Sequence, residues 1–269
     1  MTRVSVVTVC RNAASELEQT AASVVCQTGV ELEYVIVDGA SSDRTLDVIA
    51  SVQKDCDRNH VILKWKSEPD QGIYDAMNKG IAMATGEWIL FLNAGDTYTS
   101  ADVLANMLQR AEQDTQVLYG RVIHIWTFGE LEMNPAPLDI LRRKMPFCHQ
   151  SMMARTSLFR EHPYDTRYRL AGDYEWARWA YFSGKKFQYA DMLVARFESD
   201  GGASSQNRLR MTREFASICG RRNTWKWRFE YLGKALEVGF NKVVRSLLPK
   251  SVNDKMRRRN YERRGGHKK

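Results

Sequence analysis

The sequence predicts an α/β protein built on a doubly wound, mostly parallel sheet. Two observations carry this prediction. Between residues 3 and 92, β-branched or apolar runs alternate with helical patterns across short connections, which is typical of a parallel sheet. Residues 88–92 read WILFL, a continuous apolar run that suits a strand covered by helices on both faces.

The first half of the sheet is predicted from runs that end in polar turns. Residues 3–10 (RVSVVTVC) are expected to form the first strand, and a helix follows over about 13–27. Residues 32–38 (LEYVIVD) form the second strand, which ends in the turn DGASSD and leads into another helix. Residues 61–65 are expected to form a short third strand.

Residues 68–96 form the unit around which the rest of the chain is organised. The tripeptide DQG, beginning at Asp70, opens a helix whose apolar residues at positions 73, 77, 81 and 84 share one face. The strand at 88–92 follows and stops at the tetrapeptide NAGD, whose small residues let a ligand approach the backbone. Two carboxylates, Asp70 and Asp96, therefore bracket one helix–strand unit.

Beyond Asp96 the alternation weakens. Residues 117–125 read as a strand, and 133–146, with three of the six prolines, as a loop. Residues 170–176 (LAGDYEW) are expected to open a helix that runs to about 182, and a late strand is expected over 187–197, followed by the glycine–serine loop ESDGGASS. The sequence therefore specifies the second half of the fold less fully than the first.

Polar side chains at strand ends mark one edge of the predicted sheet: Thr8, Asn12, Asp38 and Asp96. Ligands bind outside the carboxyl ends of the strands in open α/β sheets. No GxGxxG follows the first strand, and no GxxxxGK[ST] occurs, so a nucleotide would be held by carboxylates and a divalent cation, Mg²⁺ or Mn²⁺. Each carboxylate also has a purely structural interpretation, Asp70 as a helix cap and Asp96 as a turn residue.

Charge is distributed unevenly along the 269 residues, whose formal net charge is +8. Residues 221–269 hold 16 Lys and Arg against 4 Asp and Glu, a net of +12, so the rest of the chain is mildly acidic. We therefore divide the chain into a domain, 1–220, and a basic helical tail, 221–269. A basic tail indicates an anionic partner.

The five cysteines are widely spaced and include no CxxC pair, so disulfides and a zinc site are not expected. No apolar run approaches the roughly 18 residues of a membrane span, and the start of the chain lacks a signal-peptide pattern. These features favour a cytoplasmic protein.

Six segments together resemble the family 2 glycosyltransferases, inverting enzymes with a GT-A fold. The segments are VSVVTVCRN, YVIVDGASSDRT, SEPDQGIYDAMNKGIAMATGEWILFLNAGD, FCHQS, AGDYEW and GGASS, and they cover residues 4 to about 205. Each segment alone is a weak signal, but their order and spacing are specific. The chain looks most like bacterial exopolysaccharide and O-antigen enzymes, including the colanic-acid type. The resemblance implies one nucleotide-binding domain with a C-terminal acceptor part.

The resemblance assigns the donor side residue by residue. Thr8 and Asn12 match the end of the first strand, near the nucleotide. Asp38 matches the carboxylate that contacts the base. Asp70 matches an acidic residue of the nucleotide pocket. Asn93 stands at the usually acidic first position of the metal-binding DxD region.

The metal and the acceptor side are assigned in the same way. Asp96 matches the last carboxylate of the DxD region, which holds the divalent metal, and because Gly95 replaces another common Asp it is the only carboxylate left there. Asp173 matches the catalytic base, although the usual Glu-Asp pair is Gly172-Asp173 here and Glu175 lies two residues on. His149 and Gln150 match acceptor-lining positions.

Three of these assignments also have a second, purely structural interpretation. Gly201 and Gly202 match a loop that closes over the diphosphate, or form an ordinary loop. Asp173 alone would more simply be a helix cap, and His149 beside Phe147 a satisfied, partly buried histidine.

These residues predict transfer of a sugar from a nucleotide-sugar, a UDP- or GDP-sugar, to a lipid-linked or saccharide acceptor in bacterial surface polysaccharide biosynthesis. Two alternatives belong to other classes: a non-catalytic nucleotide- or nucleic-acid-binding protein, and a nucleotidyltransferase. The tail contains no recognised nucleic-acid module, so no nucleic acid partner is expected.

The tail is expected to form a basic amphipathic helix over 223–248, with apolar residues such as Trp227, Leu232, Leu236 and Phe240 at helical spacing. Such a helix can lie on an anionic membrane, here the inner face of the cell membrane. In the alternative interpretation the apolar face packs on the domain and residues 256–269 are disordered.

Overall fold

The parallel half of the sheet has the predicted order. In the computed structural model, which describes residues 1–127, 129–198, 207–248, 250–262 and 266–268, the strands β1 (Arg3–Cys10), β2 (Glu31–Asp38) and β3 (Ile62–Ser67) pair in parallel. Strand β4 (Trp88–Phe91) pairs with β1 on its other side, also in parallel. Strands β1, β2 and β4 are covered on both faces, which accounts for their unbroken apolar sequences.

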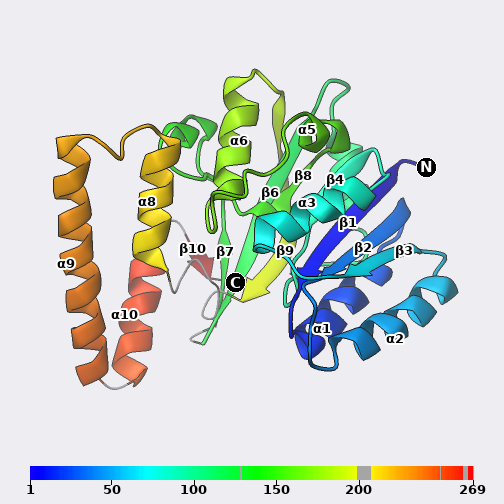
Figure 1. Ribbon diagram of the computed structural model, residues 1–269, viewed down its shortest axis with the longest axis horizontal. Helices are drawn as coiled ribbons and strands as arrows, with labels where there is room; N and C mark the ends of the chain where they lie inside the picture. Colours follow the sequence, from blue (N-terminus) through cyan, green and yellow to red (C-terminus); the bar gives the residue numbers. More distant parts are fainter. Residues whose placement is uncertain (128, 199–206, 249, 263–265, 269) are drawn as a thin grey trace.

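Two helical layers sandwich these strands. The helices α1 (Ala14–Val25), α2 (Thr45–Arg58) and α4 (Val103–Arg110) bury Leu17, Ile49 and Met107 against one face. The helices α3 (Ile73–Met83), α5 (Thr156–Glu161) and α6 (Gly172–Phe182) cover the other face and include Trp176 and Phe159, which stack at 4.0 Å. Figure 1 shows α1 and α2 on the opposite side of the sheet from α3.

The second half of the sheet is mixed, and here the structure adds to the sequence prediction. Strand β6 (Val117–Trp126) pairs antiparallel with β8 (Met152–Arg155) and β7 (Gly129–Met133), and parallel with β9 (Phe187–Glu198). Strand β8 joins this half to the first by pairing antiparallel with β4. The short β5 (Thr97–Tyr98) pairs with β9.

Several short elements have no clear sequence signal. The predicted loop at 133–146 contains a 3-10 helix, η1 (Leu138–Arg142), and a second one, η2 (His149–Ser151), leads into β8. Gly201 and Gly202, predicted to close over a diphosphate, lie outside the described residues.

The C-terminal segment is mostly helical. It comprises α8 (Arg208–Ile218), α9 (Trp225–Leu247), α10 (Lys250–Glu262) and the strand β10 (Gly266–Lys268). Figure 1 shows α9 at the margin of the molecule, beside α8. Strand β10 pairs antiparallel with β7, so part of the end predicted as disordered in one interpretation is paired with the sheet. No helix in the described part of the chain is long and apolar enough to cross a membrane.

Candidate active site

The ends of the first strands are tied together by polar side chains. The Asp38 carboxylate is fully buried and accepts hydrogen bonds from the Ser41 backbone N–H, at 2.9 Å, and from the Ser67 hydroxyl at the end of β3, at 2.6 Å. The Asn12 side-chain oxygen accepts from the Ser42 backbone N–H at 2.8 Å. These bonds shape the carboxyl edge of β1, β2 and β3, the edge at which a nucleotide was predicted.

The hydroxyl of Thr8 is engaged inside the protein. It donates to the Leu92 carbonyl at 2.7 Å and accepts from the Tyr34 hydroxyl at 3.1 Å, and Thr8 is fully buried. Its side chain therefore joins β1 to the end of β4. Thr8 and Asn12 were both predicted near the nucleotide. Asn12 is exposed, so a ligand can reach it, whereas Thr8 is buried.

Asp70 closes the turn before α3, in agreement with its predicted place at the start of that helix. Its Oδ1 accepts from the Gly72 backbone N–H at 2.8 Å. Gly72 has a φ of 126° and lies under the Arg169 side chain, because a Cβ there would come within 2.5 Å of Arg169 Nη1. Sequence reasoning missed Arg169, a cation brought to the Asp70 loop from the segment just before α6.

Asp96 is a buried acid at the end of β4. Its carboxylate Oδ2 accepts from Gln150 Nε2 at 3.2 Å, and its backbone carbonyl accepts from the Thr20 hydroxyl at 2.7 Å. Burial raises the pKa of Asp96 to about 7, because the charged form loses its hydration. A cation at this carboxylate would restore the charged form.

His149 connects the Asn93 side chain to Asp173. Asn93 Nδ2 lies 3.2 Å from His149 Nε2, and His149 Nδ1 lies 3.6 Å from Asp173 Oδ2, an ion-pair distance rather than a hydrogen bond. Burial lowers the pKa of His149, which favours the neutral ring. With the Asn93 amide N–H directed at Nε2, the neutral ring that satisfies this contact carries its proton on Nδ1, facing Asp173.

Asp173 begins α6, and its environment differs from that of Glu175. Its Oδ1 accepts from the Tyr74 hydroxyl at 3.0 Å and from the Tyr174 backbone N–H at 2.9 Å, while its side chain stays 21% exposed. Glu175 instead pairs with His162 at 3.2 Å.

Gly172 allows the close approach of Tyr74 to this acid. A Cβ at position 172 would meet the Tyr74 ring at 2.8 Å, so the glutamate common at this position in the family does not fit here. The observed packing of Tyr74 therefore requires a residue without a Cβ at position 172.

The structure thus gathers Asn93, Asp96, His149, Gln150 and Asp173 around the end of β4, with Asn12, Asp38 and Asp70 along the edge of the neighbouring strands. Gln150, predicted to contact the acceptor, contacts Asp96. His149 has both ring nitrogens directed at protein groups. The side-chain oxygen of Asn93 is buried and has no hydrogen-bond partner among the described residues.

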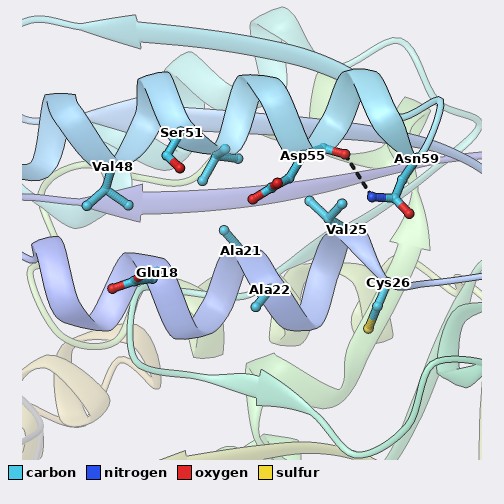
Figure 2. A pocket seen from close by; sticks show the side chains of 10 residues that line it. Glu18, Ala21, Ala22, Val25, Cys26, Val48, Ser51, Asp55 and Asn59 are labelled. Carbon is cyan, nitrogen blue, oxygen red and sulfur yellow. Dashed lines mark hydrogen bonds between the residues drawn. The ribbon is translucent and has the colours of Figure 1, made fainter.

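A surface pocket between two helices lies away from this site. Figure 2 shows its lining between α1 and α2, with a volume of about 340 Å³. The lining contains Ala21 and Ala22 on α1 and Val48 on α2, and none of the predicted site residues. We assign no function to this groove.

Comparison with known proteins identifies the class. Residues 5–171 match the family described as glycosyl transferase family 2. A "PGL/p-HBAD biosynthesis glycosyltransferase" of Mycobacterium bovis (strain BCG / Pasteur 1173P2) is 34% identical over 200 residues, covering 72% of this chain and 76% of the relative. The putative teichuronic acid biosynthesis glycosyltransferase TuaG of Bacillus subtilis (strain 168) is 35% identical over 95 residues, 35% of this chain and 36% of TuaG.

Solved structures agree on the fold. S. aureus TarS 1-349, in complex with UDP-GlcNAc, has a TM-score of 0.64 at 18% identity, covering 80% of this chain and 66% of that one. The mannosyltransferase PcManGT of Pyrobaculum calidifontis, in complex with GDP-Man and Mn²⁺, has a TM-score of 0.62 at 18% identity, covering 81% and 63%. This chain thus spans just under two thirds of each solved chain.

The fold and the match define a GT-A glycosyltransferase. The chain belongs to glycosyl transferase family 2, whose members transfer sugars with inversion.

The buried Asp96 predicts an unusual pH dependence. Because its folded pKa, about 7, lies above the ordinary 3.8, the folded metal-free protein holds the proton more tightly than the unfolded chain. The stabilisation of the folded state by protonated Asp96 is therefore fully present below pH 3.8 and is lost as the pH rises towards 7. At pH 8 in EDTA, Asp96→Asn should raise the free energy of unfolding by a few kcal/mol, on the order of 1.4 kcal/mol per pKa unit.

Urea unfolding in EDTA at several pH values measures this effect. The exposed Asp47→Asn serves as the control and should leave the pH slope of the wild type unchanged. An Asp96→Asn protein no more stable than the wild type at pH 8 would show that the carboxylate is not destabilised by burial.

Proposed function

We propose that this protein transfers a sugar, with inversion, from a nucleotide-sugar, a UDP- or GDP-sugar, to a lipid-linked or saccharide acceptor in bacterial surface polysaccharide biosynthesis. The observation that carries the proposal is the meeting of Asp96, His149 and Asp173 at the end of β4 in a family 2 glycosyltransferase. The names of the relatives support a surface glycan as product, and the UDP-GlcNAc and GDP-Man complexes of the neighbours support a nucleotide-sugar donor.

The donor would lie along the carboxyl edge of β1, β2 and β4. In this proposal Asn12, Asp38, Asp70 and Asn93 shape the nucleotide site, with Thr8 supporting it from below. Arg169, above Gly72, adds a cation that can face the diphosphate.

The residues present fit a divalent cation. The Asp96 carboxylate and the unpartnered Asn93 amide oxygen are the hard oxygen donors that Mg²⁺ and Mn²⁺ take. Within the described residues no three His, Cys, Asp or Glu side chains gather, so diphosphate oxygens would complete the coordination. When bound, the cation would offset the charge that develops on the leaving diphosphate. The Mn²⁺ of PcManGT supports this assignment.

The reaction requires a base on the acceptor side. The acceptor hydroxyl oxygen forms a bond to the anomeric carbon while the bond to the diphosphate oxygen breaks, and the electron pair leaves with the diphosphate. Attack opposite the leaving group inverts the anomeric centre. We assign the hydroxyl proton to the partly exposed Asp173.

His149 and Gln150 border the acceptor and hold the two acids. The Nδ1 atom of His149 lies 3.6 Å from the Asp173 carboxylate and so orients that side chain, while Gln150 orients Asp96. The two neighbouring residues of η2 therefore couple the donor side to the base.

Asp173→Asn should abolish transfer while donor binding persists. The amide keeps the size of the side chain and can still accept from the Tyr74 hydroxyl, but it cannot take up the proton. Loss of one general base costs about 10²–10⁴-fold in rate. The measurement is release of nucleoside diphosphate with Mn²⁺ present, alongside calorimetric titration of the nucleotide-sugar.

The matched control is Glu175→Asn, which removes the carboxylate that pairs with His162. This variant should retain transfer. If the Asp173 variant turns over like the wild type while the Glu175 variant is inactive, the base has been assigned to the wrong residue.

We further propose that the tail, 221–269, holds the enzyme at the cytoplasmic face of the membrane. One face of α9 carries five exposed large apolar side chains, 57–75% accessible: Trp225, Phe229, Leu232, Leu236 and Phe240. Trp227 and Tyr231 stack on the opposite face at 5.0 Å. We call the five exposed side chains the α9 stripe. An apolar stripe within a segment of net charge +12 is suited to an anionic lipid surface.

Replacing Trp225, Phe229 and Phe240 by Ser should reduce binding to anionic phosphatidylglycerol vesicles, measured by co-sedimentation. These residues are exposed, so their loss should leave the folded domain intact. Tyr189→Ser, an exposed aromatic on β9, is the control and should bind vesicles normally. Equal vesicle binding by the triple variant and the wild type, or no binding by the wild type at low salt, would contradict the membrane assignment.

A further inference from the structure

A second cavity, of about 380 Å³, lies between α8 and the loop that precedes α6. We call it the arginine pocket. It lies on the acceptor side of the fold, because the loop that forms one wall continues directly into the base helix at Gly172. Its lining comprises Arg167, Tyr168, Arg210, Arg213, Glu214, Ser217 and Arg222.

The single acid of the pocket is already saturated. The Glu214 carboxylate accepts from the backbone N–H groups of Arg169, Leu170 and Ala171, at 2.8–3.2 Å, and pairs with Arg210 at 3.0 Å. This cluster fixes the loop on α8. Because four donors already share the Glu214 charge, this carboxylate does little to neutralise Arg213 and Arg222.

Two guanidinium groups of the pocket have no acidic partner within the described part of the chain. Arg167 pairs with Asp165 at 2.6 Å, but no ion pair involves Arg213 or Arg222. Arg213 lies 4.8 Å from the centre of the Tyr231 ring of α9, which holds the guanidinium in place. The lining therefore carries four arginines against the one carboxylate of Glu214, which gives the pocket a net positive charge.

Guanidinium groups match phosphate oxygens in charge and in the geometry of paired hydrogen bonds. A cavity of 380 Å³ is at the small end of ligand sites, which suits a phosphate or diphosphate group rather than a complete nucleotide-sugar. Tyr168 and Ser217 add hydroxyl groups to the lining.

We propose that the arginine pocket binds the phosphate of the acceptor, a lipid-borne phosphate ester, beside the base that activates the acceptor sugar. The inference rests on the proposed function. The segment from 167 to 169 directs one arginine into this pocket and another, Arg169, over Gly72 on the donor side. Tyr231 on one face of α9 contacts Arg213 of the pocket, and the α9 stripe lies on the opposite face of the same helix. If the stripe rests on a bilayer, one helix therefore separates the pocket from the membrane surface.

Calorimetric titration of the full chain with farnesyl diphosphate tests the proposal. The titration is done in EDTA, where metal-supported donor binding is absent. Arg213→Gln together with Arg222→Gln should weaken binding by at least about tenfold, since two charge-assisted contacts are lost. Arg222→Gln alone, at a side chain with no ion-pair partner among the described residues, should weaken binding by a smaller factor, which guards against misfolding of the double variant.

Arg208→Gln is the matched control, because it removes the same charge from α8 outside the pocket lining, and it should bind farnesyl diphosphate like the wild type. Unchanged binding by the double variant would overturn the proposal. Inorganic pyrophosphate bound as tightly as farnesyl diphosphate would show a site for free phosphate and would overturn the lipid assignment.

Two further experiments test whether the pocket binds a bilayer headgroup and whether the enzyme binds a nucleotide-sugar donor. If the double variant loses only binding to phosphatidylglycerol vesicles, relative to phosphatidylcholine vesicles, the pocket recognises a bilayer headgroup and the acceptor assignment is wrong. Titration of the wild type with UDP- and GDP-sugars in Mn²⁺ tests the proposed function separately. Donor binding without farnesyl diphosphate binding would reject only the pocket, and absence of donor binding would reject the proposed function itself.

Discussion

The site depends on the antiparallel pairing of β4 with β8. In that pairing Leu90 lies opposite Met153, and extending the register three residues brings Asn93 level with Gln150. The predicted DxD region at the end of β4 thus meets η2 at the start of β8. A slip of one residue would turn every side chain of β8 to the other face, and His149 would lose Asn93 and Asp173 together. One strand pair therefore brings Gln150 to Asp96 and places His149 where it can meet Asp173 of α6.

Asp96 and Asp173 differ in how deeply they are buried and in the groups that contact them. Asp96 is deep, accepts one side-chain hydrogen bond and has a raised pKa, so it favours a proton or a cation. Asp173 stays partly exposed at the start of α6, with one oxygen held by Tyr74 and the other facing His149. The proposed transfer requires one acid beside the diphosphate and another that accepts a proton, and the different burial of Asp96 and Asp173 suits these two roles.

Local sequence was sufficient for the parallel half of the fold. The first strand was predicted with its observed bounds, and the helix predicted to open at Asp70, Gln71 and Gly72 begins directly after them at Ile73, because unbroken apolar runs and helical spacing are local signals. Strand β8 and the link between η2 and β4 depend on pairing across some 60 residues, for which no local pattern exists. Arg169 was missed for the same reason, since only the fold brings it to Gly72.

The candidate acids were predictable from their motifs, but the partners of those acids were not. The resemblance indicated Asp96 and Asp173, and it placed His149 and Gln150 beside the acceptor, which stays a prediction. The structure adds that Gln150 donates to Asp96 and that His149 lies 3.6 Å from Asp173. Thr8 and Asp38 were expected at the nucleotide, and both are buried with their polar groups engaged by the protein. Short polar residues at strand ends serve a turn or a ligand with the same atoms, and sequence does not separate the two uses.

The central claim is that His149 is a neutral bridge between Asn93 and Asp173. Nitrogen NMR of the ¹⁵N-labelled histidine ring measures its charge and tautomer directly. At pH 6.5, the ordinary pKa of histidine, the account predicts a neutral His149 with its proton on Nδ1, because burial lowers its pKa and Asn93 donates to Nε2. A charged ring at that pH, or a neutral ring with its proton on Nε2, would contradict it.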